Sequence, residues 1–102
     1  MNYKIEKIDD ETIIKLIGEV DLYNVGELKK MMFEVIKNDT NPRLIIEMKG
    51  VDYMDSSGIG ALVACHKKMN AKKGIMIIRN MKDDVLNILR LATLDKFFNI
   101  EE

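Results

Sequence analysis

Two short apolar runs limit the fold of this chain more than any other feature: Leu44–Ile46 and Ile75–Ile78. Each is short and rich in isoleucine, as buried central strands are. A stretch with apolar residues at helical spacing precedes the first run, and another lies between the two. Strands that alternate with helices in this way form sheets with parallel members, joined by right-handed crossovers. We therefore expect an α/β protein.

The rest of the chain extends this pattern in both directions. Residues 3–8 and 12–20 predict a hairpin of two strands around a polar turn, and Gly18 marks an irregularity near the end of the second strand. A third helix, beginning near residue 83, follows the second apolar run, and residues 97–100 form a last strand or a tail. The order is β-β-α-β-α-β-α with an optional final β. It predicts a mixed sheet of four to five strands in one domain over residues 1–102.

Capping residues predict where the helices begin and end. Asn24 is expected to cap the first helix, with Glu27 three positions later completing a capping-box-like pair. The second helix is expected over residues 57–73, with Gly74 as its C-cap. Asp83 is expected to cap the third.

The composition narrows the classes of function. Hydrophobic residues make up 47% of the chain and charged residues 32%, which suits a compact core under a charged surface. The net charge of -1 lacks the basic excess of a nucleic-acid binder. No apolar run approaches the roughly 20 residues of a membrane span, and the single cysteine excludes an intramolecular disulfide. We expect a cytoplasmic protein that binds neither nucleic acid nor a membrane.

The segment Tyr53–Gly60 is the most unusual in the chain, because small and polar residues separate a strand from an apolar helix. Ser56 and Ser57 fall at a helix N-terminus, where unpaired N–H groups and the helix dipole favour negative charge. A phosphate on either serine would find donors there, and it would add about -1.5 to -2 charges. Either serine could equally be a plain N-cap, and their spacing does not choose between them. Gly58 and Gly60 would let a partner approach the first helical turn closely.

Catalytic and metal sites are poorly supported. His66 is the only histidine and lies roughly 15 Å along the helix from Ser56, too far to act as its base. Asp52 and Asp55 lack the neighbouring ligands of a metal site. We expect Cys65 to be a small core residue and His66 a partly exposed helix residue. No enzymatic activity, cofactor or metal is predicted.

A cluster of lysines at the end of the second predicted helix is best explained without a ligand. From Ser56 through Lys82 the chain has no acidic residue. Its four lysines near the helix C-terminus complement the helix dipole: Lys67, Lys68, Lys72 and Lys73.

Two motifs together resemble the STAS domain: Gly18-Glu19-Val20-Asp21 after the second strand, and Met54-Asp55-Ser56-Ser57-Gly58-Ile59-Gly60 before the second helix. The chain resembles most closely the bacterial anti-sigma factor antagonists of the sporulation and general-stress type. The element order matches over essentially the whole chain.

This resemblance implies a partner switch. The unphosphorylated antagonist binds an anti-sigma factor, a serine kinase with a histidine-kinase-like ATP-binding fold, and so frees the sigma factor. Phosphorylation of the serine after the aspartate, here Ser56, breaks the complex, and a metal-dependent serine phosphatase resets it. ATP and Mg²⁺ belong to the kinase, and Ser57 is left as the expected N-cap. The residues implied in partner binding are Asp21, Asn24, Asp55, Ser56, Ser57, Gly58, Ile59 and Gly60.

Two other functions remain open from the sequence. The same domain serves as a scaffold or sensor module in stress-signalling assemblies, where it would use the same serine. A small-ligand or nucleotide-binding domain is the other alternative, although Gly58 and Gly60 alone do not make a phosphate-cradling motif.

Overall fold

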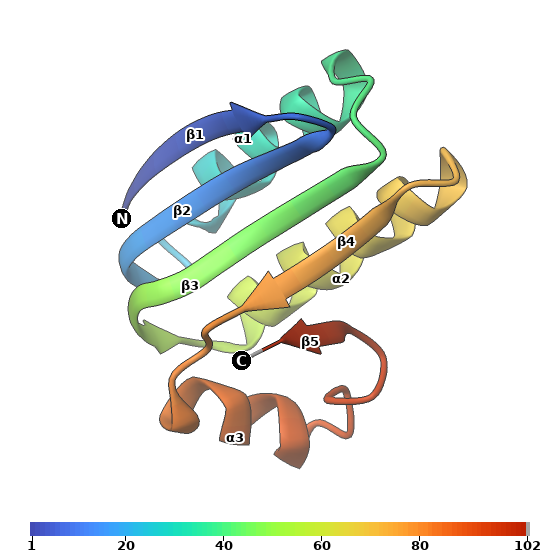
Figure 1. Ribbon diagram of the computed structural model, residues 1–102. Coiled ribbons are helices and arrows are strands. Elements are labelled where there is room, and N and C mark those ends of the chain that lie inside the picture. Colours follow the sequence, from blue (N-terminus) through green and yellow to red (C-terminus); the bar gives the residue numbers. More distant parts are fainter. Residues whose placement is uncertain (102) are drawn as a thin grey trace.

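A computed structural model describes residues 1–101 and shows one mixed sheet with three helices. The elements are β1 (Asn2–Ile8), β2 (Glu11–Val20), α1 (Val25–Asn38), β3 (Arg43–Met54), α2 (Ser56–Ala71), β4 (Ile75–Arg79), α3 (Asp83–Leu91) and β5 (Asn99–Glu101). The five strands lie in the order β1-β2-β3-β4-β5 (Figure 1). Strands β1 and β2 are antiparallel, and the other neighbours are parallel. The predicted α/β class and element order are confirmed, including the final strand.

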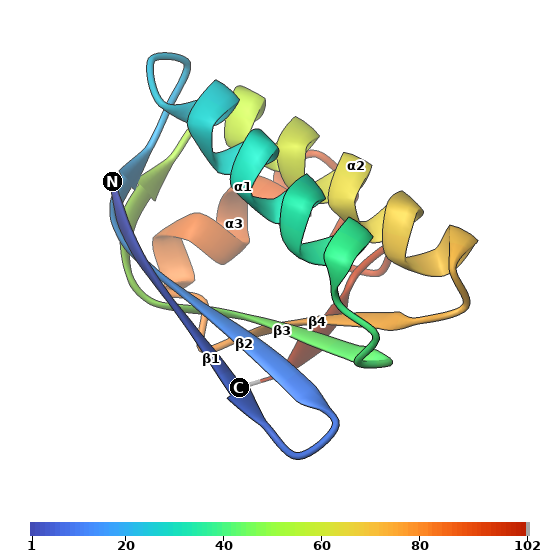
Figure 2. The same ribbon diagram turned by 90° about the horizontal axis from the view of Figure 1, so that it is seen from above.

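Helices α1 and α2 lie side by side on one face of the sheet (Figure 2), while α3 lies beyond the ends of β3 and β4 (Figure 1). The apolar stripes of both helices pack on alternate residues of the central strands, such as Ile14, Ile46 and Ile78, all fully buried. Cys65 belongs to this core, as expected, and burial raises the pKa of its thiol to about 12.

Within residues 1–101, no helix covers the opposite face of the sheet (Figure 1). Ile13, Ile45 and Ile77 stand opposite one another on β2, β3 and β4 and are buried. The aliphatic stems of neighbouring charged residues can shield such isoleucines while their charged ends stay in water. Three ion pairs flank the row: Lys15–Glu6 at 3.2 Å, Arg43–Glu11 at 2.8 Å and Arg79–Glu47 at 3.3 Å.

Strand β3 is much longer than its apolar run suggests. It continues through Met54 and so includes Asp52. The extension follows from pairing with β2, whose Val20 stands opposite Met54 and whose register shifts twice along the way. One shift falls directly after Gly18, which has a φ of +102°, so the predicted irregularity is confirmed.

The predicted caps are mostly wrong. Asn24 precedes α1, but its side chain makes no cap hydrogen bond, so there is no capping box. Lys82, not Asp83, precedes α3. After α2 the positive φ of 63° belongs to Lys73, while the N–H of Gly74 donates to the carbonyl of Met69 at 2.8 Å.

His66 is buried, with 6% of its surface exposed, so the prediction of a partly exposed residue is wrong. Its ring packs against Phe97 and Phe98, with ring centroids 4.7 and 5.5 Å away. The returning C-terminal segment covers the histidine, and that contact is invisible in the helical pattern. Burial lowers the pKa of His66.

Candidate docking site at the start of helix α2

Two connections meet where β2 and β3 end side by side (Figure 1). The turn at residues 21–24 leads from β2 into α1, and Asp55 alone connects β3 to α2. The backbone N–H of Asp55 donates to the carbonyl of Val20 at 3.1 Å. The two motifs that resemble the STAS domain are therefore in contact in space.

The Asp55 carboxylate ties these two connections together. One oxygen accepts hydrogen bonds from the N–H of Ser57 at 3.0 Å and of Gly58 at 3.3 Å, and the other accepts from the N–H of Leu22 at 3.0 Å. The hydroxyl of Ser57, followed by these backbone donors, holds the pKa of Asp55 below its ordinary value. Asp55 is thus the N-cap of α2, and the prediction that Ser57 caps the helix is wrong.

The two serines have different environments. Ser57 is half-buried, and its hydroxyl donates to Asp55 at 2.5 Å. Ser56 is exposed, and its hydroxyl makes no hydrogen bond to any residue that the structure describes. A reagent from solution or from another protein therefore reaches the Ser56 hydroxyl more readily than that of Ser57.

The helix start is also less receptive to a phosphate than the sequence suggests. Two of its N–H groups, those of Ser57 and Gly58, already donate to Asp55. A phosphate on Ser56 would meet that carboxylate as a like charge.

The turn at residues 21–24 is held by its own side chains. The Asp21 carboxylate accepts from the N–H of Tyr23 at 2.9 Å and of Asn24 at 3.2 Å. The Asn24 amide accepts from the N–H of Asp21 at 3.1 Å and donates to the carbonyl of Glu19 at 2.9 Å. These bonds give Asp21 and Asn24 a structural role in shaping the turn.

Leu22 and Tyr23 lie on this turn with 71% and 96% of their surfaces exposed. The sequence motifs did not single out either of them. A leucine and a tyrosine between Asp21 and Asn24, two good turn formers, were the available signal.

The glycines of the first helical turn serve different purposes. A Cβ on Gly58 would lie 2.6 Å from Cγ of Met54 and 2.9 Å from Cγ1 of Val20, so this glycine allows α2 to pack closely on the sheet. A Cβ on Gly60 would meet nothing within 4 Å, and Gly60 is exposed. Ile59 is buried between them. Of these three, Gly60 is the one on the open surface.

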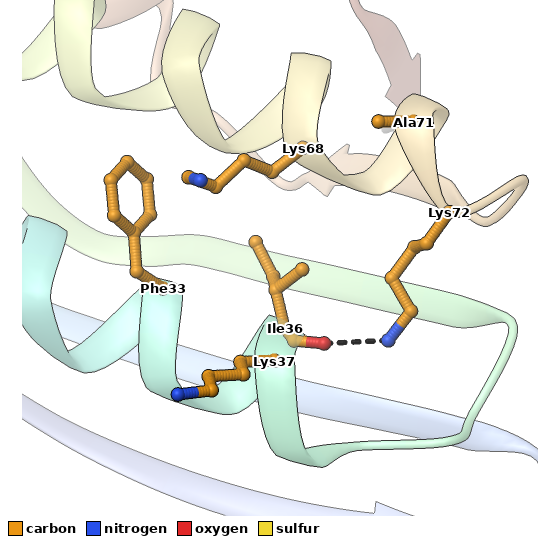
Figure 3. A pocket seen from close by; sticks show the side chains of 6 residues that line it. All are labelled: Phe33, Ile36, Lys37, Lys68, Ala71 and Lys72. Atoms are coloured by element: carbon orange, nitrogen blue, oxygen red, sulfur yellow. Dashed lines mark hydrogen bonds between the residues drawn. The ribbon is translucent and has the colours of Figure 1, made fainter.

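The lysine-rich end of α2 lines a groove of about 490 Å³ beside the end of α1 (Figure 3). Lys72 donates from Nζ to the carbonyls of Ile36 at 2.5 Å and Asp39 at 2.6 Å. Lys68 lies with its Nζ 4.6 Å from the centre of the Phe33 ring. These two cations are engaged by the chain itself, which agrees with the interpretation of this cluster as structural.

Within residues 1–101, no group of three or more His, Cys, Asp or Glu side chains is placed to hold a metal ion. No helix in that range is long and apolar enough to cross a membrane.

Comparison with known proteins shows what the whole chain is similar to. An anti-sigma F factor antagonist of Paenibacillus polymyxa is 28% identical over 88 residues, which cover 86% of this chain and 75% of that protein. A crystal structure of an anti-sigma factor antagonist from Mycobacterium paratuberculosis superposes with a TM-score of 0.88 at 22% identity, covering 98% of this chain and 84% of that one. The phosphorylated form of the Bacillus cell fate determinant SpoIIAA gives a TM-score of 0.75 at 20% identity, covering 97% and 90%. The STAS domain model matches residues 2–102, and the chain therefore belongs to the STAS domain family.

Proposed function

We propose that this protein is an anti-sigma factor antagonist, a one-domain switch over residues 1–102 controlled by phosphorylation of Ser56. The observation that carries the proposal is the contrast between the two serines: Ser56 is exposed with its hydroxyl available, while the Ser57 hydroxyl is bound to Asp55. The names of similar STAS proteins support the antagonist role.

In this proposal the site at the ends of β2 and β3, while Ser56 is unphosphorylated, binds an anti-sigma factor with a histidine-kinase-like ATP-binding fold. The anti-sigma factor then releases the sigma factor that it held. The kinase, loaded with Mg-ATP, then modifies the antagonist. The Ser56 oxygen attacks the γ-phosphorus, the bond from that phosphorus to ADP breaks, and the hydroxyl proton passes to a base on the kinase. The antagonist is the substrate in this reaction and supplies no catalytic group.

The charge around Ser56 explains how a phosphate would end the complex. The segments 16–28 and 50–66 contain no lysine or arginine. They contribute Glu19, Asp21, Glu27 and Asp55, while their remaining acidic residue, Asp52, is paired with Lys82. A phosphate on Ser56 would add about -1.5 to -2 charges to a surface that is already acidic. A partner surface shaped for a neutral hydroxyl would bury that charge uncompensated, which is strongly unfavourable. A metal-dependent serine phosphatase in the cytoplasm would restore the hydroxyl.

The test is a phosphate-transfer assay with purified anti-sigma kinases of the same organism and Mg-ATP, followed by mass mapping. We expect one phosphate, on Ser56. The Ser57→Ala variant is the matched control and should still be modified, whereas Ser56→Ala should not. Phosphate on Ser57, or equal modification of the two single variants, would contradict the proposal.

Binding measurements on the same kinase complete the test. Ser56→Ala should bind constitutively, and Ser56→Asp should bind poorly because it places a carboxylate where the phosphate would stand. Equal affinities of these two variants would overturn the switch. Light scattering on the purified chain separates this function from that of a scaffold module, which would form large particles.

A further inference from the structure

Leu22 and Tyr23, called here the anchor pair, are two large and mainly apolar side chains. Both are exposed to solvent on the turn between β2 and α1. Scattered exposed apolar residues are ordinary on protein surfaces and need no explanation. The anchor pair differs because both residues sit on one turn, with 71% and 96% of their surfaces exposed, and because the backbone beneath them is fixed.

Three side chains fix that backbone. The N–H of Leu22 donates to Asp55, the N–H of Tyr23 donates to Asp21, and Asn24 closes the turn through its bonds to Asp21 and Glu19. Holding a turn in one shape before binding lowers the entropy lost on association. Tyrosine is among the residues most enriched at the binding hot spots of protein interfaces, because its large ring has few rotatable bonds.

The anchor pair is continuous with the proposed switch. The Asp55 carboxylate bonds the N–H of Leu22 on one side and caps the helix that begins with Ser56 on the other. The turn at residues 21–24 is therefore joined through Asp55 to the start of the helix that carries Ser56.

We propose that Leu22 and Tyr23 insert into an apolar recess on the anti-sigma kinase and supply much of its affinity for this chain. This inference rests on the proposed function and names the residues that select the partner. The recess would have an aliphatic slot for Leu22 and a deeper cleft for the ring of Tyr23, with a polar group at its base for the phenol hydroxyl. Ser56 and its phosphate then decide whether this anchored complex persists.

The experiment measures the affinity of the kinase that modifies Ser56 for four variants by calorimetry: Tyr23→Ala, Leu22→Ala, Ser56→Asp and Tyr3→Ala. Tyr3 is the matched control because the same side chain is removed from strand β1, where it is 42% exposed. We expect Tyr23→Ala to weaken binding at least about tenfold, Leu22→Ala somewhat less, and Tyr3→Ala hardly at all. Because both anchor side chains are exposed, the thermal unfolding midpoints of the Tyr23→Ala and Leu22→Ala variants should stay at the wild-type value.

The outcomes separate this inference from the proposed function. Loss of binding in Ser56→Asp with Tyr23→Ala equal to Tyr3→Ala would overturn the anchor pair and leave the switch intact. Loss in Tyr23→Ala with Ser56→Asp unaffected would support the anchors and overturn the switch. A wild-type chain that binds none of its organism's anti-sigma kinases would overturn both. A wild-type dimer that Tyr23→Ala converts to monomer, with kinase affinity unchanged, would assign the anchors to a second copy of this chain and overturn the inference.

Discussion

The two ends of helix α2 carry opposite charges, and the structure uses them differently. At the N-terminal end a single carboxylate, that of Asp55, accepts hydrogen bonds from the N–H groups of Ser57 and Gly58, and the neighbouring Ser56 is exposed. At the C-terminal end Lys72 donates to the carbonyl of Ile36 near the end of α1, and the Lys68 ammonium lies over the ring of Phe33. Both ends match the helix dipole. Charge alone therefore does not show which end of the helix binds a partner. The better indication is an exposed polar group that makes no hydrogen bond within the chain.

Among the changes that test this comparison of the two helix ends, Gly58→Ala should have the largest effect. The new Cβ would press on Met54 and Val20, so α2 would have to shift away from the sheet and carry Asp55 with it. We expect a loss of about 1–3 kcal/mol in unfolding free energy, as for other overpacked cores. Urea denaturation measures it.

Gly60→Ala is the matched control for that change. Its Cβ meets open space, so the better helix propensity of alanine should stabilise the chain by about 0.5–1 kcal/mol. If Gly58→Ala were equally stabilising, the close packing of this end on the sheet would be disproved. A loss of kinase binding in Gly60→Ala, despite its stability, would show that the partner approaches the helix backbone here.

A smaller effect is expected from Asp55→Ala. It removes the acceptor shared by Leu22, Ser57 and Gly58, so both the helix start and the turn should loosen. We predict a lower melting temperature and faster amide exchange at these three residues. Exchange that is faster only at the helix start would contradict the coupling of the turn to α2.

Acid tests the same carboxylate without removing atoms. Because the folded pKa of Asp55 lies below the ordinary value of 3.8, its ionised form stabilises the fold at neutral pH. That contribution is lost as the pH falls below about 3.8 and through the folded pKa. The amide signals of Leu22 and Ser57 should therefore shift together in an NMR titration over this range. Separate midpoints for the two amides would contradict a shared acceptor.

The smallest effect is expected at the opposite end, in Lys72→Met. The substitution keeps the aliphatic stem and removes two hydrogen bonds, one partly buried and one exposed, so we expect a loss of about 0.5 kcal/mol. Kinase binding should not change, with Lys67→Met as a control for charge. A marked loss of binding in Lys72→Met alone would show that the lysine end also takes part in docking.

Much of the fold could be predicted because its signals are local. The apolar runs at residues 44–46 and 75–78 and Gly18 each act within a few residues, and the strands and the irregularity that they predict are confirmed. Contacts between distant segments produced the misses. Strand β3 is extended by pairing with β2, and His66 is covered by Phe97 and Phe98 from the end of the chain.

The candidate site also combines features that follow from the local sequence with features that depend on contacts between distant segments. The amino-acid sequence by itself determined that small and polar residues begin an apolar helix directly after a strand, and its family pattern pointed to Ser56. Only the tertiary structure decided that Asp55 is the cap, that Ser57 is engaged while Ser56 is exposed, and that Leu22 and Tyr23 stand beside them. The reason is physical: hydrophobic periodicity is a property of one segment, whereas the use of a hydrogen-bonding group depends on which other segment folding brings within about 3 Å of it.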